Sequence, residues 1–215
     1  WPVGYPALLG GLGWLTGHLM TAGQLLNIVA NLCLIVLAWR LFSPLLTPLT
    51  RGFFLLLLAL HPIVLFSSVV LMTEPLYLLL TWSTVYLVVR MPASLRRSLL
   101  LGILLALAVY LRPATLLYTV ILAAYLAWEQ RSVSQALLPL AVVVLLVAPW
   151  TLRNAEVFDR FVPVATNGGF NFLMGNHCQA SGGIAFDFDY DTRQGNEAEV
   201  STAAYRRGFA EIGRC

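Results

Sequence analysis

The sequence predicts an all-α polytopic membrane protein with about six transmembrane helices, followed by the start of an external α/β soluble region. Of the 215 residues, 59% are hydrophobic and only 11% are charged, whereas a soluble domain carries roughly 25% charged residues. The apolar residues gather into long segments before residue 150, while most acidic residues come after it. Composition and distribution together indicate a membrane protein.

Six apolar segments lie at about 23–42, 52–72, 75–90, 98–111, 114–128 and 136–150. A bilayer core of roughly 30 Å needs about 20 helical residues. The first two segments meet that length, and the last four are shorter. Short segments favour helices that are packed inside a bundle or that end at a cavity in the membrane face. Which of them fully cross the membrane is left open by length alone.

The basic residues orient these segments. All of them are Arg, so lysine chemistry of the Schiff-base or P-loop kind is excluded within this chain. Arg stands in three connections, as Arg40 and Arg51, as Arg90, Arg96 and Arg97, and as Arg131. If these connections are cytoplasmic, residues 1–22 and everything after Trp150 are external. The net charge of +3 follows this topology and predicts no nucleic-acid partner.

The chain divides into a transmembrane domain, 1–150, and an external region, 151–215, of soluble composition. The stretch FVPVATNGGFNF predicts a short strand and a turn, and NEAEVSTAAYRRGFAEIG predicts an amphipathic helix. Cys178 and Cys215 would share one aqueous side, where a disulfide can form. The chain starts at Trp1 and stops inside the predicted tail helix, so we expect a fragment of a longer protein.

Two charged residues flank predicted helix breaks at the outer face. Glu74 in LMTEPLY precedes Pro75, where a carboxylate favours the positive end of the helix dipole. The alternative is a carboxylate that faces a cavity and binds a cation, a sugar hydroxyl or another catalytic group. Arg112 in YLRPATLLY precedes Pro113, which breaks the helix there. It is either an interfacial anchor or a contact to a lipid phosphate.

Further candidates follow the last apolar segment. Arg153 and Asn154 are placed just past a helix end, either as a helix stop or as a phosphate or pyrophosphate contact. The stretch TNGGFNFLMGN suits either a surface turn or contacts to sugar hydroxyls, because Gly permits close backbone approach and Asn offers donors and acceptors. Its candidate residues are Asn167, Gly168, Gly169, Asn171, Gly175 and Asn176.

A polar stripe crosses the first apolar segment. Gln24, Asn27 and Asn31 stand three and four residues apart and so share one helix face. We favour a role in holding helices together over substrate contact. The sequence has no Ser-His-Asp set, no HExxH and no phosphate-cradling GxxxxGK[ST] motif.

Four stretches in order carry a family resemblance: WPVGYPALLGGLGWLTG, HPIVLFSSVVLMTEPLY, LRPATLLY and APWTLRNAEVFDRFVPVATNGGFNFLMGNHCQASGG. The first is similar to the P-x-GYP segment that follows the first external loop in membrane glycosyltransferases of the GT-C superfamily. The set resembles the protein-mannosyltransferase-like and lipid A aminoarabinose-transferase-like enzymes, and the bacterial branch with lipopolysaccharide core transferases. It extends to about residue 186, and GNHCQASGG departs from the Asn-Pro-like run of that family.

The resemblance implies a multi-pass enzyme of the bacterial plasma membrane that takes a sugar from a polyprenyl-phosphate carrier. The acceptor, a glycolipid, glycan or protein, would receive the sugar on the external face. Arg112 and Arg153 would meet the donor phosphate. The sugar and acceptor pocket would be lined by Glu74, Asn154, Asn167, Gly168, Gly169, Asn171, Gly175 and Asn176.

The resemblance also implies what this chain lacks. In the family the catalytic acidic residue lies in the first external loop, upstream of the GYP segment, and nothing acidic precedes Glu74 here. We therefore expect the catalytic residue upstream of Trp1, and the chain alone to be inactive. The donor sugar, the acceptor and the participation of a divalent metal are not decided by the sequence, and no visible residue requires a metal.

Two other classes of function fit parts of the pattern. A transporter or lipid flippase would also have broken helices, a buried polar stripe and Arg at the membrane edge, but no inverted repeat is visible. A non-catalytic subunit of an envelope complex would need no acidic loop upstream. A transporter would move label across liposomes without an acceptor, a transferase would need the acceptor, and a scaffold would do neither.

Overall fold

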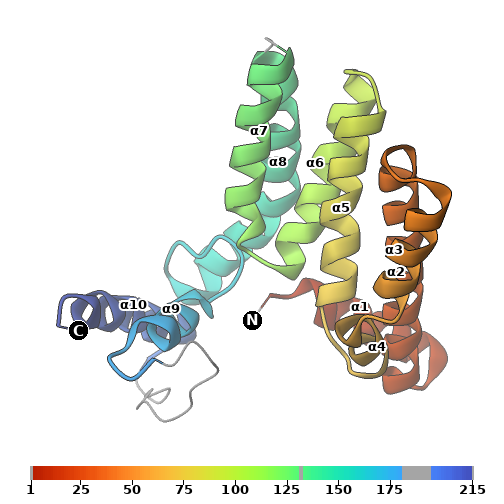
Figure 1. Cartoon of the computed structure of the whole chain (residues 1–215). Helices are drawn as coiled ribbons and strands as arrows, with labels where there is room; N and C mark the ends of the chain where they lie inside the picture. The colour runs from red at the N-terminus through yellow and green to blue at the C-terminus, as the bar shows by residue number, and fades with distance from the viewer. Residues whose placement is uncertain (1, 131–132, 181–194, 215) are drawn as a thin grey trace. The chain divides into compact units, whose positions relative to one another are not determined.

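The computed structural model describes residues 2–130, 133–180 and 195–214, apart from the side chains of residues 130, 134 and 135. All regular elements in these ranges are helical. In chain order they are α1 (Gly4–Thr16), α2 (Leu19–Phe42), η1 (Ser43–Leu45), α3 (Pro48–Ala59), α4 (Pro62–Val69), α5 (Glu74–Arg90), α6 (Leu95–Leu111), α7 (Thr115–Gln130), α8 (Val133–Phe158), α9 (Gly168–Asn176) and α10 (Glu197–Ile212). The all-α prediction is confirmed (Figure 1).

The chain forms two compact units, and each is described by itself. The bundle unit is Pro2–Leu146 and the tail unit is Val147–Cys215. In the bundle unit α2 packs against α1, α3, α4 and α5, and α5 packs in turn against α6. In the tail unit α9 packs against α10.

The number of membrane spans differs from the predicted six. Among the described residues, two helical stretches are long and apolar enough to cross a membrane, Leu19–Leu45 and Ala136–Phe158. A third span results if the bent pair α3 and α4 counts as one. The 16–17 residues of α5, α6 and α7 extend only about 24–26 Å at 1.5 Å per residue, short of a bilayer core of roughly 30 Å. The prediction of a membrane protein holds, and the count of six full spans is wrong.

The apolar segment 52–72 is broken rather than continuous. α3 ends at Ala59 and α4 begins at Pro62, with a bend of 41° between them. Pro62 lacks an N–H and disfavours helical geometry in the residue before it, and His61 is accordingly extended with φ −60° and ψ 128°. The His61 ring Nδ1 accepts a bond from the Ile63 N–H at 3.3 Å, so this side chain caps the new helix.

The polar stripe of α2 supports the broken segment. Gln24, Asn27 and Asn31 donate side-chain amide bonds to backbone carbonyls of α4 and the residue after it. The bonds are Gln24 to Val69 at 2.8 Å, Asn27 to Ser67 at 3.0 Å and to Val70 at 3.2 Å, and Asn31 to Val64 at 3.2 Å. The last carbonyls of a helix lack intrahelical partners, and lipid offers none. The predicted role of the stripe in holding helices together is therefore confirmed.

A helix that the sequence analysis did not assign precedes α2. α1 occupies residues that were expected only to lie outside the membrane, and it packs against α2 and α6. Tyr5 and Leu9 are its buried residues. The helix ends at Thr16 and is capped by Gly17, whose φ of 71° is left-handed and whose N–H bonds to the Gly13 carbonyl, a common helix termination.

Arg side chains close two helices at one end of the bundle unit, which we call the basic end. It carries Arg40, Arg51, Arg90, Arg96 and Arg97. Arg90 Nη2 donates to the Arg40 carbonyl at 3.0 Å at the end of α2. Arg97 Nη1 donates to the Met91 carbonyl at 2.9 Å just after α5. These two Arg stabilise helix ends in addition to any part in setting topology.

The tail unit corrects three predictions. α8 continues to Phe158, so Arg153 and Asn154 lie inside a helix and not past its end. No strand occurs in the described residues 159–180, and TNGGFNFLMGN forms α9 instead of a turn. In the described part of the expected external α/β region, the regular elements are therefore helices.

The predicted amphipathic tail helix is confirmed as α10. Asn196 and Glu199 begin it with a reciprocal capping box. α10 ends at Ile212, so the expectation that the chain stops inside this helix is wrong. The disulfide that can form between Cys178 and Cys215 involves a residue outside the described ranges.

Candidate functional site

The bundle unit brings two sequence-predicted residues into direct contact. Arg112 Nη2 donates to Glu74 Oε1 in an ion pair, and the same nitrogen lies 3.5 Å from Thr73 Oγ1. The guanidinium carbon of Arg112 stands 5.3 Å from the centre of the Tyr77 ring, within the range of a cation–π contact. Together these four residues form what we call the Arg112 site, where the start of α5 meets the end of α6 (Figure 1).

Local sequence places both charges at helix ends. Arg112 follows the last residue of α6, and its φ of −145° and ψ of 111° are extended, as expected before Pro113. Its N–H still bonds to the Ala108 carbonyl at 2.8 Å. Glu74 is the first residue of α5, where a negative charge favours the positive end of the helix dipole.

An apolar cluster beneath the pair fixes its position. Its buried members are Tyr5 and Leu9 of α1 and Leu111, the neighbour of Arg112. The partly buried members packed against them are Leu26, Leu71, Leu76, Tyr77 and Leu80. α1 also approaches α6 closely, because a Cβ added at Gly4 would lie 2.8 Å from the Tyr110 carbonyl oxygen. Packing between α1, α5 and α6 therefore sets the geometry of the charged pair.

The Arg112 site is accessible, and the Arg112 guanidinium keeps N–H donors that a ligand can use. The side chain of Arg112 is 42% exposed and that of Glu74 is 35% exposed. An ion pair this exposed contributes only about 0–1 kcal/mol, so a ligand can compete with it. Among the described residues Arg112 Nε and Nη1 make no hydrogen bond. That edge of the guanidinium suits an anionic oxygen, while the Glu74 carboxylate repels anions from the other edge.

Arg153 lies in the tail unit, on an exposed face of α8. Its Nη1 donates to Asn154 Oδ1 at 3.2 Å, and its guanidinium carbon lies 5.0 Å from the centre of the Trp150 ring. The aromatic face orients the cation but leaves most of its donors in solvent. Since the two units are not placed relative to each other, Arg153 and Arg112 are two separate candidate cations.

The Asn154 side chain is buried and bonded to backbone carbonyls of its own unit. It is 2% exposed, and its Nδ2 donates to the carbonyls of Val162 and Val164, each at 3.2 Å. Trp150 Nε1 donates to the same Val164 carbonyl at 2.9 Å, and Thr151 Oγ1 donates to the Pro163 carbonyl at 2.7 Å. These side chains fasten the chain after α8 back onto that helix.

Gly168 and Gly169 let α9 and α10 approach each other. A Cβ added at Gly169 would lie 2.0 Å from the Ser201 carbonyl oxygen, and one at Gly168 would lie 2.3 Å from the Tyr205 hydroxyl. The Gly169 N–H also donates to Ser201 Oγ at 3.1 Å. Neither glycine has a positive φ, so their small size matters here and their backbone freedom does not.

The remaining predicted residues of this stretch differ in availability. Asn171 and Gly175 are exposed, and a Cβ at Gly175 would meet nothing within 4 Å. Asn176 Nδ2 donates to the Phe172 carbonyl at 2.8 Å within α9. Asn167 precedes α9 and makes no capping bond. Asn171 and Asn167 therefore keep amide groups that a ligand can reach.

The turn after α9 is tied to α10 by a charge. Glu211 Oε2 accepts from the Cys178 N–H at 3.0 Å and Oε1 from Arg207 Nε at 3.1 Å. The Cys178 bond, and after it the Arg207 guanidinium, lower the pKa of Glu211 below its ordinary value. The carboxylate is thus ionised when it holds this turn.

Sequence reasoning missed two members of the Arg112 site. Thr73 adjoins Glu74, and Tyr77 lies one helical turn after it, on the same face of α5. The i, i+3 spacing was a readable signal for Tyr77, but contact with Arg112 depends on a fold that spans 38 residues. No group of three or more His, Cys, Asp or Glu that could hold a metal occurs among the described residues.

Comparison of the chain with family models, with curated proteins and with solved structures found no match.

Proposed function

We propose that this chain is part of a membrane glycosyltransferase that moves a sugar from a polyprenyl-phosphate carrier to an acceptor on the external face. The proposal rests on the GT-C-like order of its sequence stretches and on one geometric observation. That observation is the half-exposed Arg112 at a helix break, whose Nε and Nη1 make no hydrogen bond to any residue that the structure describes. The lipid of the donor lies along the apolar helices, and its phosphate meets this edge.

Within this proposal the site residues have different parts. Arg112 binds the donor phosphate and Glu74 orients the guanidinium, while Tyr77 covers one face of the cation. Arg153 is a second cation for the phosphate or the acceptor, in the tail unit. Asn167, Asn171 and the open backbone at Gly175 remain for the sugar or the acceptor, whereas Asn154, Gly168 and Gly169 act through packing.

A binding experiment with this chain tests the phosphate step directly. The purified chain in uncharged detergent is titrated with undecaprenyl phosphate and with undecaprenol, which has the same isoprenoid chain and no phosphate. We expect the phosphate to bind more tightly. Arg112→Gln should weaken undecaprenyl phosphate binding roughly ten- to hundredfold, because a charge-assisted hydrogen bond contributes about 1.5–3 kcal/mol. Native mass spectrometry gives both dissociation constants.

The matched control is Arg96→Gln, which removes an equal charge at the exposed start of α6, at the opposite end of that helix. It should leave undecaprenyl phosphate binding nearly unchanged. Equal binding of the two lipids, or equal loss in the two variants, would remove the phosphate contact and with it the observation that carries the proposal.

Turnover separates the transferase from its rivals. Liposomes containing the complete gene product are given undecaprenyl-phosphate donors labelled in a hexose or a pentose, with and without lipid A. Release of undecaprenyl phosphate that requires the acceptor supports a transferase. Movement of the label across the membrane without acceptor identifies a transporter and contradicts the proposal.

A further inference from the structure

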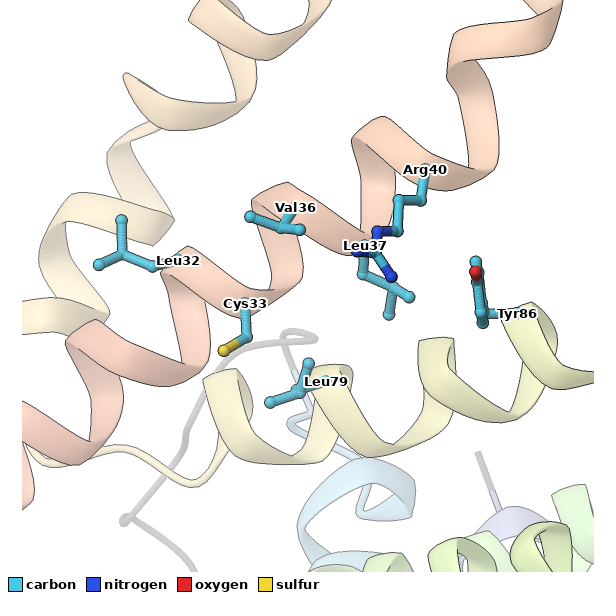
Figure 2. A pocket seen from close by; sticks show the side chains of 7 residues that line it. All are labelled: Leu32, Cys33, Val36, Leu37, Arg40, Leu79 and Tyr86. Carbon is cyan, nitrogen blue, oxygen red and sulfur yellow. The ribbon is translucent and has the colours of Figure 1, made fainter.

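A groove runs between α2 and α5 toward the basic end, far along the helices from the Arg112 site. It has a volume of about 290 Å³ and is lined by Leu32, Cys33, Val36, Leu37, Arg40, Leu79 and Tyr86. Figure 2 shows that the first five come from α2 and the last two from α5. The volume is at the low end of the roughly 300–1,000 Å³ of small-molecule pockets, so the groove accommodates part of one lipid chain.

The groove changes character along its length. Cys33, Leu37 and Arg40 follow one face of α2 at spacings of four and three residues, and Leu79 and Tyr86 stand two turns apart on α5. The lining is therefore aliphatic for about 10 Å, at 1.5 Å per residue, and polar at one end. Figure 2 shows the Arg40 side chain reaching from α2 into the space between the two helices.

The cation at the end of the groove is uncompensated. Within the part of the chain that the structure describes, the Arg40 guanidinium has no hydrogen bond or ion pair. Arg90 adds a second positive charge, since its guanidinium bonds to the Arg40 and Leu41 carbonyls. The only acidic residues in the bundle unit are Glu74, which pairs with Arg112, and Glu129 on α7. This end of the groove thus attracts an anion.

An exposed Trp beside Arg40 indicates the depth of the polar end of the groove in the membrane. Trp39, the neighbour of Arg40 at the end of α2, is 43% exposed, and exposed Trp is enriched where the lipid headgroups begin. Basic pockets between membrane helices bind the phosphates of anionic lipids. An acyl chain can pack against the aliphatic part of the groove. A phosphate can pair with the Arg40 guanidinium and accept a hydrogen bond from the Tyr86 hydroxyl.

We propose that the groove between α2 and α5 binds an anionic glycerophospholipid, with one acyl chain against Cys33, Leu37 and Leu79 and the phosphate at Arg40. Tyr86 donates its hydroxyl to the same phosphate. This site does not depend on the transferase proposal, because it uses other residues and a different lipid. It holds the ends of α2 and α5 together through a ligand in addition to the Arg90 contacts.

Cys33 offers a direct readout, because it is a free, exposed thiol within the groove. The purified chain in uncharged detergent is titrated with dioleoyl phosphatidylglycerol or with dioleoylglycerol, which has the same acyl chains and no phosphate. N-ethylmaleimide then alkylates the thiols, and peptide mass mapping gives the rate at Cys33 alone. We expect phosphatidylglycerol to slow alkylation at concentrations where dioleoylglycerol does not.

Two variants and a control locate the phosphate. Arg40→Gln should weaken protection by phosphatidylglycerol roughly ten- to hundredfold, and Tyr86→Phe roughly two- to tenfold. Arg96→Gln removes an equal exposed charge at the basic end outside the groove, and should cost at most about fivefold through general surface attraction. Fold integrity is checked by helical circular dichroism. Within the described residues the Arg40 side chain makes no hydrogen bond or ion pair that the substitution would remove.

Three results overturn the proposal. They are equal protection by the two lipids, equal loss in Arg40→Gln and Arg96→Gln, and protection that follows protein concentration instead of lipid concentration. The last result would identify a second copy of the chain as the occupant of the groove. Loss of undecaprenyl phosphate binding in Arg112→Gln with intact Cys33 protection would separate this lipid site from the transferase site.

Discussion

Asn27 is a polar residue with no exposed surface in the middle of an apolar helix. Its amide donates to two carbonyls at the end of α4, and its Oδ1 accepts from the Tyr5 hydroxyl of α1 at 3.1 Å. One side chain therefore links three helices. The Arg112–Glu74 pair works differently, because it is half-exposed and contributes little to stability. At the scale of residues, buried amides hold the bundle and exposed charges remain available for ligands.

Replacing Asn27 tests this division. Asn27→Leu keeps the branching and the number of side-chain heavy atoms but leaves the Ser67 and Val70 carbonyls and the Tyr5 hydroxyl without their bonds. We expect the free energy of unfolding to fall by about 1–3 kcal/mol, measured by titration with a denaturing detergent. A single interhelical hydrogen bond in a membrane contributes about 0.6 kcal/mol. The expected loss of stability is therefore the sum over the three bonds of Asn27. Leu25→Ala, at an exposed site of α2, should cost less, and an equal cost would contradict this account.

At the scale of elements, helix breaks and close helix crossings shape the molecule. Pro62 divides the segment 52–72 into α3 and α4, and the amides of α2 bond to the carbonyls of the last turn of α4. In the tail unit the two glycines at the start of α9 permit the crossing with α10. The composition favoured a surface turn at these glycines, with contacts to sugar hydroxyls as the alternative. Glycine also permits two helices to approach each other closely, and this is its role at Gly168 and Gly169.

A pair of glycine substitutions within α9 distinguishes these uses. Gly169→Ala places a Cβ against the Ser201 backbone carbonyl, and such overpacking costs about 1–3 kcal/mol. We expect faster amide hydrogen exchange across α9 and α10. Gly175→Ala enters open space on the same helix and should slow exchange slightly, because Ala favours helix over Gly by about 1 kcal/mol. If both variants behave alike, the crossing does not depend on Gly169.

At the scale of the whole molecule, charge distribution and apolar length define the membrane protein. The basic end gathers Arg residues from α2, α3, α5 and α6 at one end of the bundle unit. Such an end favours the cytoplasmic side. That the chain after residue 150 is external, as the transferase proposal requires, stays a prediction from the sequence.

Reporter fusions test the orientation. Alkaline phosphatase, which is active only outside the cytoplasm, is fused after Pro92 near the basic end or after Arg160 following α8. We expect low activity at the first site and high activity at the second, and the reverse pattern with a cytoplasmic reporter. Inverted results would place the Arg112 site on the cytoplasmic side and exclude an external transfer reaction.

From the sequence alone one could predict the class of protein, the approximate regions of most apolar helices and the amphipathic α10. These features follow from composition and from signals between residues at most four positions apart, such as Pro at a helix start and the capping residues of α10. It also supplied Arg112 and Glu74 as separate candidates. The hydropathy pattern predicted an end of α8 that is too early. It does not show the bonds from Asn154 to Val162 and Val164, which lie in the next part of the chain.

Which candidate residues contact one another depends on the packing of the helices. Arg112 and Glu74 are 38 residues apart, and their contact depends on how α1, α5 and α6 pack around a shared apolar cluster. The same holds for Gly169 and Ser201, and for the groove between α2 and α5. Hydropathy and helix propensity are properties of short windows, whereas side-chain partners across helices are set by close packing, which no window contains.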